Sequence, residues 1–460
     1  MRWDRRLSVL VACSVAAVLL SPVGPAAAQD DPDGSQPLPG YRVNNPPLAP
    51  MLVDGGFTRV VQGIHGHAAY DLEVPPKWNG ELVMFAHGTR EDTKELTVDL
   101  PPFGLREQLL RQGYAWAASS YTVNGYDAGS GVSSTHDLAE YAATELLGHR
   151  PTRTYITGGS MGGHVVARSL EEYSGYYDGA LSLCGQLGDI RLFDYFLDAN
   201  LAAQALAGVD AYLATEDYPT DALPLIKKRL GITDLQVGQD PTTVAGRQYQ
   251  QMLTELSGGP RPGADEAMGI YVGAMLAAAP PPTPRTTKDT TQNITTRYQP
   301  TYPVDINKTV ERVAPSSWAR RNSMALNDVP RIVGKPNVPV MSLHDIGELF
   351  VPLSMEQSYA KKVAGNGQSD LLVQRGIRGA LHCDFTEAEV GKAWKDLTSW
   401  VERRAAHGED AARPAGDNFL SRKEVASMTF GCRFSDPNAP KGLSRDLFPT
   451  CPAADLPARR

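Results

Sequence analysis

The pattern that most constrains the fold is an alternation of short apolar runs with amphipathic segments. The runs have the length and β-branched content of buried strands, and they lie at residues 81–88, 113–121, 153–158, 179–185, 338–345 and 370–377. Helical patterns separate most of them, as at residues 103–113, 134–148 and 163–173. This alternation predicts an α/β fold with a doubly wound, mostly parallel sheet, and the β-rich residues 57–74 predict a hairpin or edge strands beside it.

The alternation breaks once, between about Gln186 and Lys335. Amphipathic segments fill this stretch, at residues 192–208, 221–231, 244–259 and 265–279. Roughly 150 mostly helical residues between two sheet strands indicate a cap inserted over one end of the sheet. We therefore divide the chain into a signal peptide (1–28), a sheet domain in two parts (29–186 and 336–405), a cap (187–335) and a C-terminal tail (406–460).

The first residues have the features of an export signal. Three arginines lie within the first six residues, an apolar stretch follows at 7–20, and Ala26-x-Ala28 offers a cleavage site. We expect cleavage near Ala28 and a secreted protein, because no other run reaches the roughly 18 apolar residues that a membrane span needs. A lipidation box ending at Cys13 and a twin-arginine signal are the competing interpretations.

Charge and composition narrow the range of partners. The chain has 52 acidic and 44 basic residues, a net charge of −8 and no long basic run, which argues against a nucleic-acid partner. We expect no stable membrane association, no cofactor and no metal. His65 and His67 alternate on an expected strand, but neither has cysteine or carboxylate partners close by in the sequence.

The segment TYITGGSMGGHVV, Thr154 to Val166, places Ser160 among four glycines. A serine between a parallel strand and a helix needs a sharp turn, and side chains two residues before and after it would collide with the neighbouring strand and helix. Gly158 and Gly162 meet this need, so the pattern predicts a nucleophile elbow with Ser160 as the nucleophile. A glycine-rich connection that only packs a helix against the sheet is the structural alternative.

A nucleophilic serine needs a histidine base. His344, His382 and His407 follow Ser160 by enough chain to come from later strands. We choose His382, because it falls in the loop after the last expected strand. His407 lies past the expected terminal helix and is expected to be solvated, and His164 is expected to pack near the elbow.

The base needs an orienting carboxylate, for which the stretch VPVMSLHDIGELFVP offers Asp345 and Glu348. Many serine hydrolases carry this acid three residues before a Val-Pro pair, here Val351-Pro352, so we choose Glu348. Asp345 is the alternative, and either residue could simply cap the following helix. For the oxyanion, we expect the backbone amides of Met161, directly after the nucleophile, and of Thr89, in the loop after the first main strand.

Four cysteines remain after the expected cleavage of the signal peptide. In an oxidising compartment two disulfides are expected. Cys184 and Cys383 both fall at the carboxyl edge of the expected sheet, whereas Cys432 and Cys451 share a tail too short to build its own core. We therefore predict that Cys184 pairs with Cys383 and Cys432 with Cys451.

The chain resembles a serine hydrolase of the α/β-hydrolase superfamily, of the secreted esterase or lipase kind with a large cap. The resemblance rests on four stretches: HGT, GGSMGG, HDIGELFVP and LHCDFT. The resemblance covers roughly residues 57–405 by motif order. The chain departs from familiar patterns in lacking an extended His-Gly-Gly-Gly motif, in using Glu as the expected acid, and in having no cysteine beside Ser160.

Ester hydrolysis through an acyl-enzyme on Ser160 is the predicted function, with a small-molecule or polymeric ester as substrate. A secreted peptidase or aminopeptidase of the same fold is the alternative enzyme. An aminopeptidase would need cap carboxylates for the substrate amine, and the candidates are Glu216, Asp217, Asp265 and Glu266. A catalytically inactive, hydrolase-like binding module is the alternative from another class.

Overall fold

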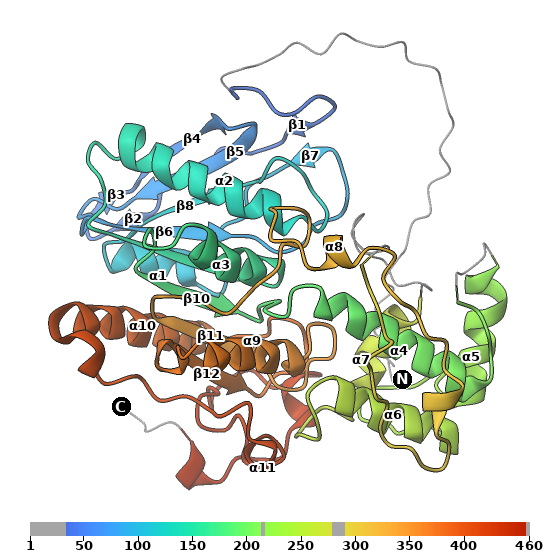
Figure 1. Cartoon of the computed structure of the whole chain (residues 1–460). Helices are drawn as coiled ribbons and strands as arrows, with labels where there is room; N and C mark the ends of the chain where they lie inside the picture. The colour runs from blue at the N-terminus through green and yellow to red at the C-terminus, as the bar shows by residue number, and fades with distance from the viewer. Residues whose placement is uncertain (1–33, 213–216, 278–289, 457–460) are drawn as a thin grey trace, which may run out of the picture. The chain divides into compact units, whose positions relative to one another are not determined.

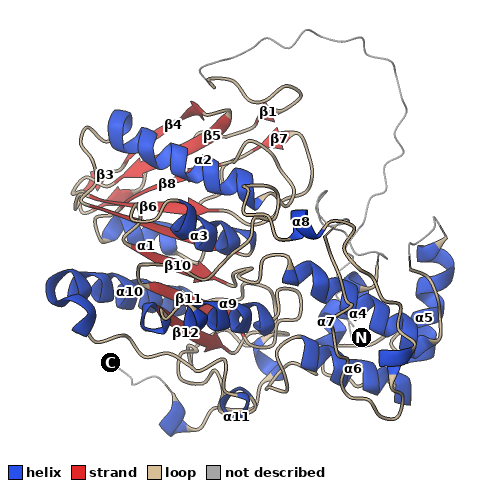
Figure 2. Cartoon of the chain, viewed as in Figure 1, coloured by secondary structure: helices blue, strands red, loops and turns tan. Residues whose placement is uncertain are grey.

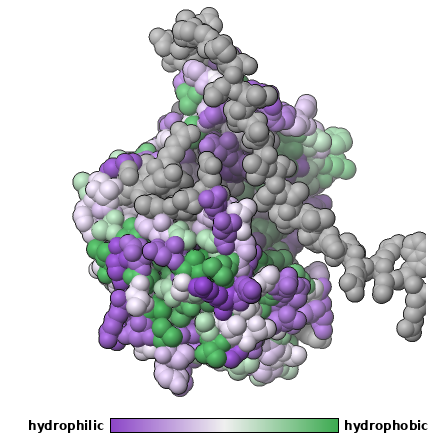
Figure 3. Space-filling view, turned by 90° about the vertical axis from the view of Figure 1, so that its right-hand side faces the viewer, coloured by the Kyte–Doolittle hydropathy of each residue, from purple (hydrophilic) through white to green (hydrophobic). Residues whose placement is uncertain are grey.

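The computed structural model of the chain describes residues 34–212, 217–277 and 290–456. The predicted signal peptide, residues 1–28, lies outside the described residues, as does Glu216. In the part of the chain that is described, no helix is long and apolar enough to cross a membrane. On the face shown in Figure 3, hydrophilic residues are interspersed with hydrophobic ones.

An eight-stranded sheet forms the centre of the described chain (Figure 1). Its strand order is β12-β11-β10-β9-β6-β8-β5-β4. The strands are β4 (Arg59–His65), β5 (Ala68–Val74), β6 (Glu81–Ala86), β8 (Ala115–Ser119), β9 (Arg153–Gly159), β10 (Gly179–Leu183), β11 (Val340–Asp345) and β12 (Leu372–Ile377). From β8 to β12 neighbouring strands are parallel, whereas β5 is antiparallel to both β4 and β8. The predicted mostly parallel sheet and its edge hairpin are confirmed.

Helices cover both faces of this sheet, as Figure 2 shows. On one face, α1 (Leu105–Arg111) and α10 (Glu387–His407) bury leucine and tryptophan side chains in one core cluster. On the other face, α2 (Ala128–Tyr141), which continues as the π-helical turn η1 (Ala142–Leu146), shares a second cluster with α3 (Met161–Glu172) and α9 (Leu353–Gly365). The sheet is therefore doubly wound, and the near-continuous apolar strands follow from this burial on two faces.

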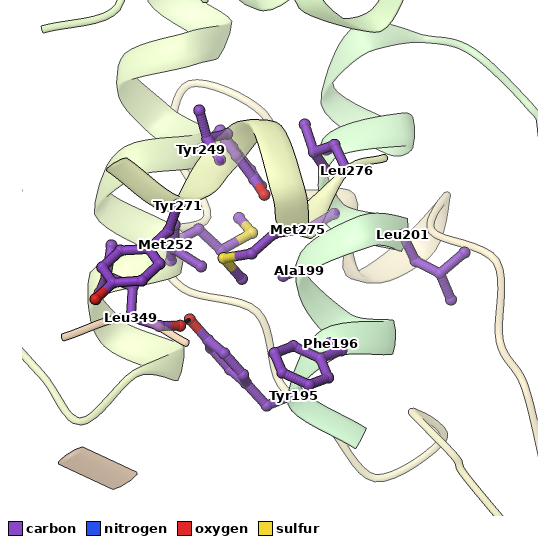
Figure 4. Close-up of a cluster of buried hydrophobic side chains, with 14 of the residues drawn as sticks. Tyr195, Phe196, Ala199, Leu201, Tyr249, Met252, Tyr271, Met275, Leu276 and Leu349 are labelled. Carbon is purple, nitrogen blue, oxygen red and sulfur yellow. Dashed lines mark hydrogen bonds between the residues drawn. The ribbon is translucent and has the colours of Figure 1, made fainter. Parts of the chain in front are cut away.

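Between β10 and β11 the chain forms a mainly helical region, which we call the inserted segment (residues 187–335, the predicted cap). Its helices are α4 (Arg191–Ala207), η2 (Tyr218–Ala222), α5 (Leu223–Leu230), α6 (Val244–Leu256), α7 (Met268–Met275), η4 (Ile306–Lys308) and α8 (Trp318–Arg321). All of them except α8 contribute to one core of buried side chains, part of which Figure 4 shows. This core also includes Leu349 and Ala380 from the sheet domain. The inserted segment is thus packed against the loops that follow β11 and β12.

Shorter elements complete the described chain. Two small sheets pair β1 (Arg42–Val43) with β7 (Glu95–Leu96) and β2 (Leu52–Val53) with β3 (Gly56–Phe57). The remaining helical turns are η5 (Ser369–Leu371), η6 (Gly408–Asp410), α11 (Arg422–Val425), η7 (Arg445–Leu447) and η8 (Ala453–Asp455). The described part of the C-terminal tail buries Phe419, Val425 and Phe430 against Ile346 and Leu353.

Two sequence-based helix boundaries were wrong. Helix α2 begins at Ala128, not at residue 134, because the side chain of Asp127 accepts a hydrogen bond from the Ser130 amide and caps the helix six residues earlier. Its Gly129 lies so close to the backbone of Leu326 and Asn327 that no larger residue would fit there. His407 does not lie past α10 but is its last residue, and it is exposed as expected.

Candidate active site

Ser160 occupies a sharp turn between β9 and α3. Its backbone angles, φ 57° and ψ −123°, lie in a region that residues with a side chain rarely adopt. The surroundings hold the turn in place, because the Ser160 amide donates to the Leu183 carbonyl (3.1 Å) and the Ser160 carbonyl accepts from the Gly163 and Gln186 amides (2.9 Å each). The serine therefore stands at the N-terminus of α3, where the free amides favour a developing negative charge.

The glycines on either side of Ser160 are needed because backbone atoms pass close to them. A Cβ atom at Gly158 would lie 2.7 Å from the Ala86 carbonyl oxygen and 2.6 Å from that of Gly162. A Cβ atom at Gly162 would overlap the same Ala86 oxygen. The turn thus has the steric requirement expected of a nucleophile elbow, with β6 on one side and α3 on the other.

His382 and Glu348 come together from the loops after β12 and β11. Nδ1 of His382 pairs with Oε1 of Glu348, whose side chain is fully buried, while the imidazole is 27% exposed. The same Oε1 accepts a hydrogen bond from the Val351 amide (2.8 Å), so the loop itself fixes the carboxylate. Burial lowers the pKa of His382, but the charge and hydrogen bond of Glu348 outweigh it and raise that pKa above its ordinary value.

Asp345 and His344 face elsewhere. Oδ2 of Asp345 accepts from the Asp384 amide (2.9 Å), and burial followed by the nearby charge of Glu348 raises the pKa of Asp345 well above its ordinary range. His344 is buried, with Nε2 2.9 Å from the Val351 carbonyl oxygen. Of the two candidate carboxylates, Glu348 is therefore the one that contacts His382.

The places of these residues in the strand order decide the fold family. A serine follows β9 at a strand-to-helix turn, a carboxylate follows β11 and a histidine follows β12, in a doubly wound sheet with an antiparallel edge. The chain has the α/β-hydrolase fold. The eight strands of the sheet and the Ser160 turn all lie outside the inserted segment.

Comparison with known proteins gives distant similarities. No family model matches the chain. An o-phthalyl amidase from Xanthobacter agilis is 22% identical over 403 residues, covering 73% of this chain and 86% of that protein. Among solved structures, an esterase from Aspergillus oryzae has a TM-score of 0.42 at 13% identity, covering 75% of this chain and 79% of its own. Feruloyl esterase B from the same organism has a TM-score of 0.41 at 14% identity, covering 72% and 74%.

Ser160 and His382 line one cavity of about 680 Å³, a volume within the usual range for small-molecule binding sites. Thr89 and Met161, whose amides were expected to bind the oxyanion, line the same cavity. A Cβ atom at Gly88 would lie 3.2 Å from the Cβ atom of Ser160, so the loop after β6 passes directly beside the serine. The structure thus brings together the serine, the histidine and both predicted oxyanion residues.

Aromatic rings form one wall of this cavity. Phe193 and Phe196 come from α4, Phe350 from the loop after β11, and Tyr126 from the loop before α2. Tyr126 packs edge-on against Phe193, at 5.0 Å between centroids, and Phe350 packs edge-on against the ring of His382, at 5.9 Å. The sequence places many aromatic residues in the expected cap, which could line an acyl pocket or form the cap's own core, and Phe193 and Phe196 are two of these that line the cavity. The sequence gives no comparable signal for Tyr126 or Phe350.

His164 holds Tyr126 in position. It is fully buried on α3, where Nε2 lies 2.6 Å from the Pro330 carbonyl oxygen and Nδ1 lies 2.8 Å from the Tyr126 hydroxyl. Burial lowers the pKa of His164 to about 4, so the ring is neutral and Nδ1 accepts a hydrogen bond from the Tyr126 hydroxyl. Gln186 donates to the same hydroxyl (3.0 Å), which fixes the ring at the cavity wall.

Several other candidates lie away from this cavity. Among the described residues, Asp217, Asp265 and Glu266, considered for binding a substrate amine, do not line it. Four tyrosines of the inserted segment are buried in its core instead: Tyr195, Tyr218, Tyr249 and Tyr271. His65 stacks on Tyr141, and Nδ1 of His67 lies 2.9 Å from the Gln36 carbonyl oxygen.

Two disulfides join the cysteine pairs expected from the sequence. Cys184, directly after β10, is bonded to Cys383, directly after His382, with 5.3 Å between Cα atoms. Cys432 is bonded to Cys451 within the tail, with 5.7 Å between Cα atoms. A Cβ atom at Gly159 would lie 3.9 Å from the Cys184 sulfur, so the first disulfide packs beside the elbow as well as beside His382.

Proposed function

We propose that the chain is a secreted serine hydrolase that cleaves carboxylic esters. The observation that carries this proposal is the pairing of His382 with buried Glu348 at the cavity that also holds Ser160 on its strained turn. A serine, a histidine and an orienting carboxylate are the parts that acyl transfer requires. The disulfides support secretion, because such bonds persist mainly in oxidising compartments.

In the proposed reaction, Nε2 of His382 takes the proton of Ser160 Oγ as that oxygen attacks the ester carbonyl carbon. The amides of Met161 and Thr89 stabilise the tetrahedral oxyanion. Collapse of this intermediate releases the alcohol, which receives the proton from His382 and leaves the acyl group on Ser160. A water molecule then gives a proton to His382 and attacks the acyl-enzyme, releasing the acid and restoring the serine.

The lining of the cavity supports an apolar or aromatic group next to the scissile bond. Phe193, Phe196 and Phe350 offer ring faces and edges on the inserted-segment side of Ser160. Aromatic ring pairs gain about 0.5–1.5 kcal/mol beyond the burial of their area. An acyl group or leaving group with a ring therefore suits this wall.

Amide hydrolysis is the second candidate function. The relative that is similar over 73% of this chain is named an amidase, and the same serine chemistry cleaves amides when the leaving amine is protonated. The described cap carboxylates put forward for binding an amine do not line the cavity, so they lend no support to an aminopeptidase.

A matched pair of substrates tests these proposals: the p-nitrophenyl ester and the p-nitroanilide of the same aromatic acid, assayed with wild type and with Ser160→Ala. We expect ester hydrolysis that depends on Ser160 and little cleavage of the anilide. Comparable kcat/KM values for both substrates would make the chain an amide hydrolase, and no Ser160-dependent cleavage of either would contradict both proposals.

A further inference from the structure

The inserted segment contacts the two loops that carry Glu348 and His382 through buried polar side chains. The hydroxyl of Tyr195 donates to the Leu349 carbonyl (2.8 Å), and the hydroxyl of Tyr271 donates to the Ala380 carbonyl (2.7 Å). Figure 4 shows Tyr195 and Leu349 meeting below the apolar core of the segment. These contacts link the inserted segment to the site rather than to the rest of the sheet.

Arg261 makes the most extensive of these contacts. It lies in the loop between α6 and α7, and only 7% of it is exposed. Nε donates to the Ile346 carbonyl and Nη2 to the Glu348 carbonyl (3.2 Å), so two bonds reach the loop after β11. Nη1 donates to the Ser257 hydroxyl (3.1 Å) and the Gly259 carbonyl (2.9 Å), which anchor the guanidinium in its own segment.

The planar guanidinium suits this arrangement, because its donors point in fixed directions and can hold several carbonyls at once. The loop it holds is short. Ile346 follows β11 directly, and Glu348 turns back so that its carboxylate meets both the Val351 amide and His382. A shift of the Glu348 backbone would therefore move the carboxylate away from the imidazole.

The charge of Arg261 also bears on this loop. Burial lowers the pKa of Arg261 to about 10, against the opposing influence of Tyr195, Asp265 and Glu348. The side chain thus remains cationic at neutral pH. A buried cation needs nearby negative charge or aligned carbonyl dipoles, and here it receives both from the segment that ends at Glu348.

We propose that Arg261 is a positioning residue for the reaction: by binding the carbonyls of Ile346 and Glu348, it holds the Glu348 carboxylate against His382 and couples the inserted segment to the active site. This inference rests on the proposed function for its catalytic consequence. Arg261 is not one of the described residues that line the cavity. It therefore acts through Glu348 and not on the substrate.

The proposal is tested by steady-state kinetics of two variants, Arg261→Gln and Arg261→Lys, and of a matched control. Arg229→Gln is the control, because Arg229 lies in the same segment and also donates to backbone carbonyls, those of Ala207 and Gly208, without touching the loop after β11. We expect kcat to fall about ten- to a hundredfold in Arg261→Gln, the range for losing hydrogen bonds from a charged group, with KM within about threefold of wild type. Arg229→Gln should match wild type.

Arg261→Lys keeps the charge and most of the volume but loses the planar fork, and it provides a second variant should the glutamine disrupt folding. We expect a kcat loss of about three- to tenfold, smaller than that of a folded glutamine variant. An unchanged kcat in Arg261→Lys, or equal losses in Arg261→Gln and Arg229→Gln, would overturn the proposal.

A proton NMR measurement without substrate separates this proposal from the proposed function. The proton between His382 Nδ1 and Glu348 should give a resonance at unusually low field in the wild type. We expect this resonance to be lost or shifted in the Arg261 variants and retained in Arg229→Gln. Wild-type resonances in folded Arg261 variants would overturn the positioning role, whereas a wild-type protein with the resonance but no hydrolase activity would contradict only the proposed function.

Discussion

The carboxylate of Glu348 contacts Nδ1 of His382, and the Glu348 side chain is fully buried whereas the imidazole is partly exposed. The carboxylate has no contact with bulk water, and a backbone amide of its own loop, that of Val351, fixes its orientation. Nε2 of His382 lies 3.6 Å from the Cys383 sulfur, and the residue lines the same cavity as Ser160.

Glu348→Gln should lower kcat by about three to four orders of magnitude, because the amide can neither hold the correct tautomer nor stabilise the imidazolium. Asp345→Asn should have a much smaller effect, since an asparagine oxygen can still accept the hydrogen bond from the Asp384 amide. Steady-state kinetics of both variants check this order. A larger loss in Asp345→Asn would transfer the role of orienting acid to Asp345.

The pH dependence of kcat/KM should reflect the raised pKa of His382. Since the base must be unprotonated, activity should rise with pH along a limb whose midpoint lies above the ordinary histidine value of about 6.5. Glu348→Gln removes both influences that raise this pKa and leaves burial, which lowers it. The limb of the residual activity should therefore move to lower pH, and a limb that stays in place would argue against the Glu348–His382 pair.

The same pair should make a pH-dependent contribution to stability. A pKa that is raised in the folded state stabilises the fold below the unfolded-state pKa, and this contribution is lost as pH rises through the folded-state value. Denaturant unfolding of wild type and Glu348→Gln across this range checks the sign, because the difference between their unfolding free energies should shrink as the pH increases.

The two disulfides should differ in their effect on activity. Replacing Cys184 and Cys383 by serine frees the loop that carries His382 and should lower kcat in a protein that is still folded. Replacing Cys432 and Cys451 opens a link with a sequence separation of 19 residues, and should cost about 3 kcal/mol of stability with little change in kcat. Kinetics and denaturant unfolding of both double variants measure this, and equal kcat values would contradict a role for the first disulfide at the site.

The aromatic wall should determine acyl preference. Phe196→Leu keeps the cavity apolar but removes a ring, so kcat/KM for an aromatic ester should fall about two- to tenfold while that for a short aliphatic ester changes little. Phe57→Leu provides the matched control, because Phe57 is an exposed aromatic residue outside the cavity. Equal losses on both esters in Phe196→Leu would show that the ring matters for packing alone.

Local sequence patterns were enough to predict the sheet and the place of Ser160. The apolar runs identified the six parallel strands, and Gly158 and Gly162 indicated the strand-to-helix turn at Ser160, because that turn has no room for larger residues. For the role of orienting acid, the sequence could only rank Glu348 above Asp345. The two carboxylates are three residues apart on a tight loop, and the sequence does not show which of them faces the histidine. Their directions depend on tertiary contacts with Val351 and Asp384.

Arg261 shows what local patterns could not predict. Its neighbours, in the stretch SGGPRPGADE, have the composition of an exposed loop. Burial of the guanidinium depends on carbonyls of Ile346 and Glu348 that lie far away in the sequence. Phe419 and Phe430 are similar cases, because the tail that carries them reads as polar yet buries both rings beside the sheet.

The central claim is that Ser160 is an activated nucleophile, and the most direct test is covalent labelling with a fluorophosphonate followed by peptide mapping. Activation by His382 should give one adduct, on the peptide that contains Ser160, and Ser160→Ala should abolish both the adduct and ester hydrolysis while leaving the protein folded. A folded wild-type protein that acquires no adduct, or acquires it on another serine, would contradict the claim.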